Sequence, residues 1–273
     1  MASLPAANGT ADAVVVTIDG HSTARTVFIG CLLLEIGFVL FDYHVNYGRL
    51  TEIGALRRLA NIAREDGLAS WFATSQTLLV GMTAWGFWVG VRARRAELWR
   101  QAGWLLVAML FTYMAVDDGA QLHERFGAAY AAFREQGASR FPSFAWQPLF
   151  VPLFGTVGAA AGIFLWRELR SRWATSLVVA AFLLFGIAVG LDFLEGLESD
   201  HPWNLYAAAV TSYDMTHFTE TRFSQMPYDT LVHFSRSLEE FVEMLANTCI
   251  WTAMLGRAGA VIQHVRFQAK PVR

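Results

Sequence analysis

Acidic side chains interrupt four of the long apolar stretches in this sequence. They are Glu35 and Asp42; Asp117, Asp118 and Glu124; Asp192, Glu195 and Glu198; and Glu239, Glu240 and Glu243. A charged side chain at the bilayer centre costs about 2.5–3.5 kcal/mol on insertion scales, so such residues usually face the interior of a helix bundle and mark a site. The pattern therefore predicts a buried carboxylate site.

Several carboxylates in a low-dielectric site repel one another unless cations balance them or some of them hold protons. Arg236 and Arg125 neutralise at most two of the acids. Two chemical solutions stay open. One or two metal ions bind the carboxylates together with His123 or His233, or the acids pass protons or cations along the bundle. A layer of hydrogen bonds and ion pairs with a purely structural role is the third interpretation.

The mixture of carboxylates and imidazoles favours a divalent ion of iron, manganese or zinc. The expected metal ligands are Asp117, Asp118, His123, Asp192, Glu195, His233 and Glu240. Glu124 and Glu243 are the expected catalytic bases, placed beside the ligands where metal-bound imidazoles need orienting partners. The Glu-x-x-His spacing that di-iron carboxylate bundles use is absent, which argues against a standard di-iron site.

Other cofactors and partners fit the sequence poorly. Neighbouring acids would repel the propionates of a haem, and a retinal Schiff base is excluded within the helices because Lys270, the one lysine, lies in the tail. We therefore expect no haem and no retinal. The net charge of −2 argues against a nucleic-acid partner, which needs a basic face.

The composition, 55% hydrophobic and 16% charged, is richer in apolar residues than that of an ordinary soluble domain. Six stretches approach the length of about 20 apolar residues that spans a bilayer. They are Val27–Tyr43, Leu68–Val91, Ala102–Gln121, Phe150–Trp166, Ala174–Glu195 and Leu231–Leu255. The predicted fold is an all-α polytopic membrane bundle of about six transmembrane helices. It occupies residues 26–257, between a mobile N-terminal tail, 1–25, and a C-terminal tail, 258–273.

Arginines gather in the segments after the second, fourth and sixth predicted helices, which the positive-inside rule assigns to the cytoplasm. The expected location is a bacterial inner membrane, with both termini cytoplasmic. Counted from that side, Asp42, Asp117, Asp192 and Glu240 lie about 15–18 residues along their helices, or roughly 22–27 Å. Acids on four helices thus share one depth, towards the periplasm.

On the last predicted helix, His233, Arg236, Glu240 and Glu243 share a face, which we expect to point at the third and fifth helices. His123 is about 100° away from the face of Asp117, so it joins the site only if the helix breaks or bulges at Gly119. The connection 51–64 is expected to form a helix on the membrane surface or packed on the bundle. The longest connection, 199–230, is a lid or disordered.

The acidic pattern, Asp117-Asp118 followed by His123-Glu124 and then by Glu239-Glu240-Phe-Val-Glu243-Met244, resembles that of uncharacterised bacterial multipass membrane proteins. The resemblance covers the third to sixth helices and implies a family without an assigned activity. We expect a membrane-embedded metal-binding site, and the sequence leaves open whether that site serves a metal-dependent enzyme. A proton- or cation-coupled transporter or channel, and an accessory subunit of a larger membrane complex, are the alternatives.

Overall fold

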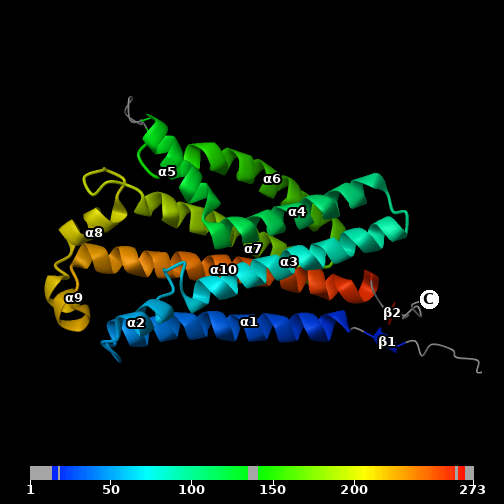
Figure 1. Cartoon of the computed structure of the whole chain (residues 1–273), viewed down its shortest axis with the longest axis horizontal. Helices are drawn as coiled ribbons and strands as arrows, with labels where there is room; N and C mark the ends of the chain where they lie inside the picture. Colours follow the sequence, from blue (N-terminus) through cyan, green and yellow to red (C-terminus); the bar gives the residue numbers. More distant parts are fainter. Residues whose placement is uncertain (1–13, 18, 135–140, 262–263, 268–273) are drawn as a thin grey trace, which may run out of the picture.

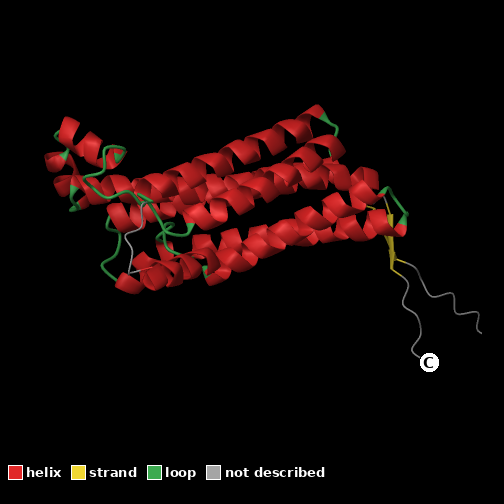
Figure 2. Ribbon diagram, turned by 90° about the horizontal axis from the view of Figure 1, so that it is seen from above, coloured by secondary structure: helices red, strands yellow, loops and turns green. Residues whose placement is uncertain are grey.

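The computed structural model describes residues 14–17, 19–134, 141–261 and 264–267, most of them in helices that run alongside one another (Figures 1 and 2). Each long helix corresponds to one of the six predicted stretches. They are α1 (Gly20–Asp42), α3 (Leu68–Ala93), α4 (Leu98–Ala120), α6 (Gln147–Glu168), α7 (Arg172–Glu195) and α10 (Pro227–Val261). The all-helical bundle predicted from the sequence is therefore confirmed in its helices.

Shorter elements fill the connections. They are the π-helix η1 (Tyr43–Tyr47), α2 (Gly54–Ala60), α5 (Leu122–Arg134), α8 (Leu205–Ser212), α9 (Thr216–Phe223) and the strands β1 (Val14–Thr17) and β2 (His264–Phe267). The strands pair antiparallel, with Val14 opposite Phe267. Within the predicted N-terminal tail, residues 1–13 and 18 lie outside the described residues, whereas β1 and the first turns of α1 are formed. The connection 199–230 contains two helices where the sequence predicted a lid or disorder.

Local sequence explains where several helices begin. The Asp19 carboxylate accepts hydrogen bonds from the backbone N–H groups of His21, at 3.1 Å, and Ser22, at 3.4 Å, and so caps α1. Ser171 caps α7 in the same way, and Asn204 caps α8. These side chains satisfy backbone donors that have no partner within the first turn of a helix.

Fewer helices meet a membrane-span criterion than the six that the sequence predicted. Among the described residues, three helical segments are long and apolar enough to cross a membrane: Gly20–Tyr47, α6 and α7. The bent pair of α4 and α5 adds a fourth if it counts as one span. The difference at α10 has a physical reason. This helix packs against α1, α3 and α7, and Met244, Ala246, Thr248 and Ile250 are fully buried, so its surface meets protein and need not be apolar all round.

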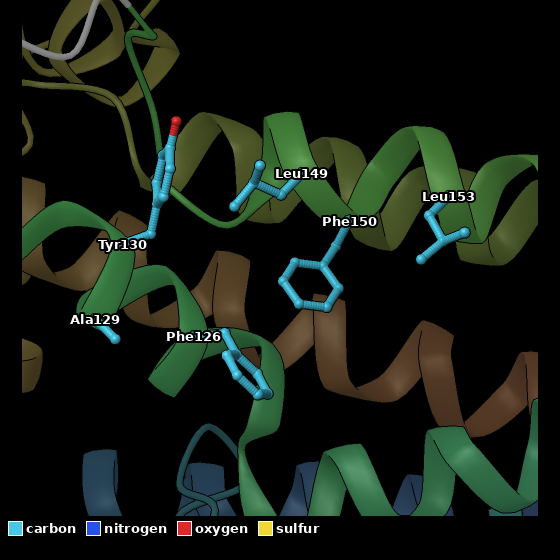
Figure 3. A pocket seen from close by; sticks show the side chains of 6 residues that line it. All are labelled: Phe126, Ala129, Tyr130, Leu149, Phe150 and Leu153. Carbon is cyan, nitrogen blue, oxygen red and sulfur yellow. The ribbon is translucent and has the colours of Figure 1, made fainter. Parts of the chain in front are cut away.

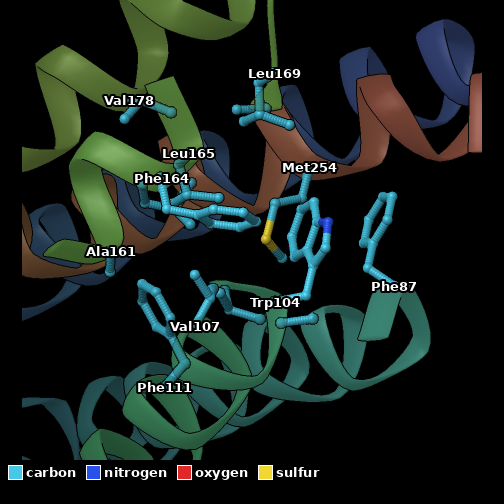
Figure 4. Packing of buried hydrophobic residues seen from close by; sticks show 14 of the residues in the cluster. Phe87, Trp104, Val107, Phe111, Ala161, Phe164, Leu165, Leu169, Val178 and Met254 are labelled. Carbon is cyan, nitrogen blue, oxygen red and sulfur yellow. The ribbon is translucent and has the colours of Figure 1, made fainter. Parts of the chain in front are cut away.

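The largest apolar core of the described residues lies between α3, α4, α6, α7 and α10 (Figure 4). The Trp104 indole stacks on Phe87, with ring centroids 4.3 Å apart, and meets Phe164 edge-on at 5.4 Å. Leu165 and Met254 are fully buried in the same cluster. This packing joins α3, α4, α6 and α10, and it fixes the helix register that positions the acidic residues further along.

The outer faces of the helices are apolar. Leu33 on α1, Trp71 and Met82 on α3, and Leu183 on α7 each expose more than half of their surface. Exposed apolar area on this scale marks a surface that contacts lipid or protein. The arginine-rich α3–α4 turn lies at the same end of the bundle as the start of α1, while α2, α5, α8 and α9 lie at the other end (Figure 1).

Candidate acidic site

A break between α4 and α5 brings His123 to the acids. Gln121 ends α4 in the left-handed conformation, with φ 53° and ψ 42°, and the two helices meet at an angle of 66°. Asp117 then accepts two hydrogen bonds from His123, one from its backbone N–H at 2.9 Å and one at ring Nδ1, 2.8 Å away. The break required by the sequence argument is present, two residues beyond the predicted Gly119.

Trp146 packs against α5, the helix that follows the break. The His123 ring meets the Trp146 indole edge-on, with centroids 4.6 Å apart. One turn later, a Cβ added at Gly127 would lie 2.8 Å from Cβ of Trp146, so only glycine allows this approach. The first turns of α5 therefore lie against the segment that begins α6, and the position of His123 is fixed from both sides.

Two further carboxylates on neighbouring helices accept hydrogen bonds from polar side chains. The Thr74 hydroxyl of α3 donates to Asp118, and the Gln147 amide of α6 donates to Asp192 Oδ2 at 2.6 Å. On α7, Glu195 pairs with Arg236 of α10. Residues of α3, α4, α5, α6, α7 and α10 thus contribute to these contacts, whereas Asp42, which the sequence analysis placed at the same depth, pairs with His233.

The carboxylates of α10 complete the site. Glu243 interacts electrostatically with Asp118 on α4, Asp192 on α7 and His123 on α5. We call the mutually interacting carboxylates the acidic layer: Glu65, Asp117, Asp118, Glu124, Asp192, Glu195, Glu239, Glu240 and Glu243. Glu239, Glu240 and Glu243 are half-buried, so the layer is partly open to the outside.

Glu65 belongs to this layer although the sequence analysis did not include it. It lies in the loop between α2 and α3, is exposed, and its carboxyl group interacts electrostatically with those of Glu124 and Asp118. Partial desolvation, followed by the charges of Glu124 and Asp118, raises the pKa of Glu65 to about 7. The sequence did offer one signal for Glu65. It lies about one turn before the predicted start of the second helix, which places it at the depth of Asp118.

His233 lies apart from the other expected ligands. Its Nε2 is 3.1 Å from Asp42 Oδ2 on α1, and its ring packs on Tyr47, with centroids 5.0 Å apart. Asp42 also accepts from Asn46 at 2.7 Å and from Ser237 at 3.3 Å. The predicted polar face of α10 is thus divided: His233 turns to α1, whereas Arg236 and Glu243 turn to α7 and α4 as expected.

The π-helix η1 positions the polar residues around Asp42 and His233. It continues α1 past Asp42 and carries Asn46, whose side chain is hydrogen-bonded to Arg57 of α2. Asn46 Nδ2 donates to the Arg57 carbonyl oxygen at 3.1 Å, and Asn46 Oδ1 accepts from Arg57 Nε at 3.3 Å. π-Helical turns are rare and often occur at functional sites. Here the turn ties α2 to the end of α1 beside the acidic layer.

In the described part of the chain, no group of three or more His, Cys, Asp or Glu side chains has an arrangement that holds a metal ion. One open pocket lies beside the layer, between α5 and α6 (Figure 3). It is lined by Phe126, Ala129, Tyr130, Leu149, Phe150 and Leu153. This lining is apolar and includes no carboxylate, so the pocket suits an acyl chain or an aromatic group rather than an ion.

A family model described as a domain of unknown function, DUF8692, matches residues 26–258 of the chain. The match agrees with the resemblance to an uncharacterised family. No curated protein and no solved structure matches the chain.

Proposed function

This chain belongs to the DUF8692 family, and we propose that it is a multipass membrane protein whose acidic layer binds and exchanges protons, in a proton-coupled transporter or channel. In this proposal all six long helices cross the bilayer. The membrane is a bacterial inner membrane, both termini are cytoplasmic, and the acidic layer opens to the periplasm.

The observation that carries the proposal is that the carboxyl group of Glu65 interacts with those of Glu124 and Asp118 at the outer end of the acidic layer. Neighbouring carboxylates repel one another, so binding of a proton to one of them is favoured. Both side chains are exposed, and Glu65 interacts with Asp118 deeper in the layer. A pair of acids that can take up a proton at the surface thus lies beside a series of acids that leads into the bundle.

Proton flux into reconstituted vesicles tests this function directly. A pH-sensitive dye inside the vesicles reports proton uptake driven by a potassium diffusion potential. Wild-type protein should carry protons well above the rate of empty vesicles, and Glu243→Gln should reduce that rate at least tenfold. Glu220→Gln, which changes an exposed acid of α9 outside the layer, is the matched control and should retain the full rate. A wild-type rate equal to that of empty vesicles refutes the proposal.

Labelling of single cysteines tests the topology. Cys31 and Cys249 are buried, so they contribute little background. A membrane-impermeant maleimide added from the periplasmic side should modify Ser212→Cys, on exposed α8, and should leave Ala93→Cys, at the arginine-rich end, unmodified. The opposite pattern refutes the proposed orientation.

A divalent metal site in the same layer is the second candidate function, and one contact favours it. Asp117 holds Nδ1 of His123, the arrangement that orients metal-binding imidazoles in proteins. Asp118, Asp192 and Glu240 would supply carboxylate ligands, with Glu124 and Glu243 as bases in a membrane enzyme. Elemental analysis of purified protein separates the candidates. Stoichiometric iron, manganese or zinc that is lost in Glu240→Gln supports the metal site, and metal-free wild-type protein supports proton exchange.

A third candidate, an accessory subunit of a larger membrane complex, rests on the exposed apolar helix faces, which suit either lipid or a protein partner. Purification in a mild detergent tests it. A stoichiometric partner that remains bound through size-exclusion chromatography supports this candidate, and a single species with the mass of this chain and its detergent contradicts it.

A further inference from the structure

A further polar group, separate from the acidic layer and from the Asp42–His233 pair, lies deeper in the bundle, between α1, α3 and α10. At its centre is Glu35, which is fully buried seven residues before Asp42 along α1. Seven residues of helix correspond to about 10 Å. Gln76 of α3, 2% exposed, donates from Nε2 to Glu35 Oε1 at 3.0 Å, and the Thr248 hydroxyl of α10 donates to the same oxygen.

Two atoms of this group have no hydrogen-bond partner in the described part of the chain. They are Glu35 Oε2 and Gln76 Oε1, both of them buried oxygens. An unsatisfied buried polar atom destabilises the folded protein, so two such atoms in one pair of side chains require an explanation. Both belong to side chains that already share one hydrogen bond. A proton on Glu35 Oε2 that is donated to Gln76 Oε1 would satisfy both atoms and, with the existing hydrogen bond, form the two-bond ring of a carboxylic acid and an amide.

The surroundings supply no competing charge. The side chains that bond to Glu35 are Gln76 and Thr248, and the titratable groups beside it are the thiols of Cys31, on α1, and Cys249, on α10. No arginine, lysine or histidine of the described residues interacts with Glu35. A buried carboxylate with no cation carries a desolvation cost that a bound proton removes.

We propose that Glu35 is a proton-binding site, in which the proton sits on Oε2 and is donated to Gln76 Oε1. The proton forms an O–H bond on the carboxylate and leaves as a proton, so no electrons are transferred. Asn247 lies one turn from Glu243 and donates to Thr77 Oγ1 at 3.0 Å, next to Gln76 in the chain. The site therefore follows the acidic layer in the direction of the membrane interior. This inference rests on the proposed function for its role but not for its test.

Infrared difference spectroscopy tests the site without a transport measurement. A protonated carboxyl group has a C=O stretch that a carboxylate lacks. The spectrum of wild type minus Glu35→Gln should show one such acid band. Glu35→Gln should also unfold at the wild-type temperature or above, because its amide N–H replaces the acid O–H towards Gln76.

A second variant keeps the test independent of how Glu35→Gln folds. Gln76→Met removes the acceptor, so the acid band should move to higher wavenumber as its hydrogen bond is lost. Carboxylate bands in place of the acid band overturn the proposal. A second result also overturns the proposal: sodium, but not choline, raises the melting temperature of the wild-type protein, and Glu35→Gln abolishes this rise. The site would then bind a metal cation instead of a proton. Absence of vesicle proton flux, by contrast, refutes only the proposed function.

Discussion

Replacing Asp117 should loosen α5 from the bundle, because one carboxylate makes both hydrogen bonds that hold His123. It accepts the His123 backbone N–H at 2.9 Å, as a helix cap does, and it holds ring Nδ1 at 2.8 Å. Loss of a cap costs about 0.5–2 kcal/mol. Loss of a hydrogen bond to a charged group costs about 1.5–3 kcal/mol.

The exposure of the pair sets which end of these ranges applies. The side chains of His123 and Asp117 are 27% and 14% exposed, so water competes for both and the lower values are appropriate. Repulsion between Asp117 and the adjacent Asp118 is also relieved. We expect Asp117→Ala to lower the free energy of unfolding by about 1.5–2 kcal/mol. Asp117→Asn keeps one acceptor oxygen and should cost about 1 kcal/mol.

Reversible unfolding in mixed micelles measures these values, with Glu220→Ala as the control for loss of an exposed acid. A double-mutant cycle with His123→Ala isolates the coupling, and spin labels at Met109 on α4 and Ala129 on α5 report the bend. An Asp117→Ala protein within about 0.5 kcal/mol of wild type, or a cycle without coupling, contradicts the reasoning, since surface substitutions commonly reach that size. An unchanged spin-label distance would show that Trp146 alone holds α5.

Three further substitutions have defined outcomes. Glu168→Gln should lower the free energy of unfolding by about 3 kcal/mol, because it leaves Arg100 beside a buried neutral group, and a change below about 1 kcal/mol contradicts this. Gln121→Gly should raise the free energy of unfolding, measured in the same micelles, by about 0.5–1 kcal/mol, because glycine adopts the left-handed conformation without strain. A lower free energy of unfolding would show that the Gln121 side chain stabilises the protein by more than the strain costs. The pKa of Glu65 is raised from 4.5 to about 7, so its stabilising contribution is full below pH 4.5 and is lost as the pH rises through 7. Glu65→Gln should therefore flatten the melting temperature against pH in that window, and an unchanged slope contradicts the shift.

The helices were predictable because their signal is local. Apolar length and arginine-rich connections placed all six long helices, and α7, for example, ends at Glu195 as predicted. The acidic layer was predictable in part for the same reason, since residues at one depth on adjacent helices must meet. Asp118, Asp192 and Glu243 accordingly interact.

What the sequence did not determine depends on backbone breaks and on which helices are neighbours. His123 required a left-handed residue, and nothing in the local sequence distinguished Gln121 from Gly119 as its position. His233 shares a face with Glu240 on a helical wheel, but α1 lies on that side of α10 and supplies Asp42. Glu65 was missed because a loop, unlike a helix, has no periodicity that indicates where its side chains lie.

The pairing of the first and last long helices has a consequence for biosynthesis. Asp42 and His233, which are bonded across α1 and α10, are separated by 191 residues in the chain. At the usual 5–20 residues per second, a ribosome takes roughly 10–40 s to travel that distance. During this interval α1 has been made, but Glu35 and Asp42 lack their α10 partners. The nascent helix must therefore stay beside the insertion machinery, or at the edge of the membrane, until the end of translation closes the bundle.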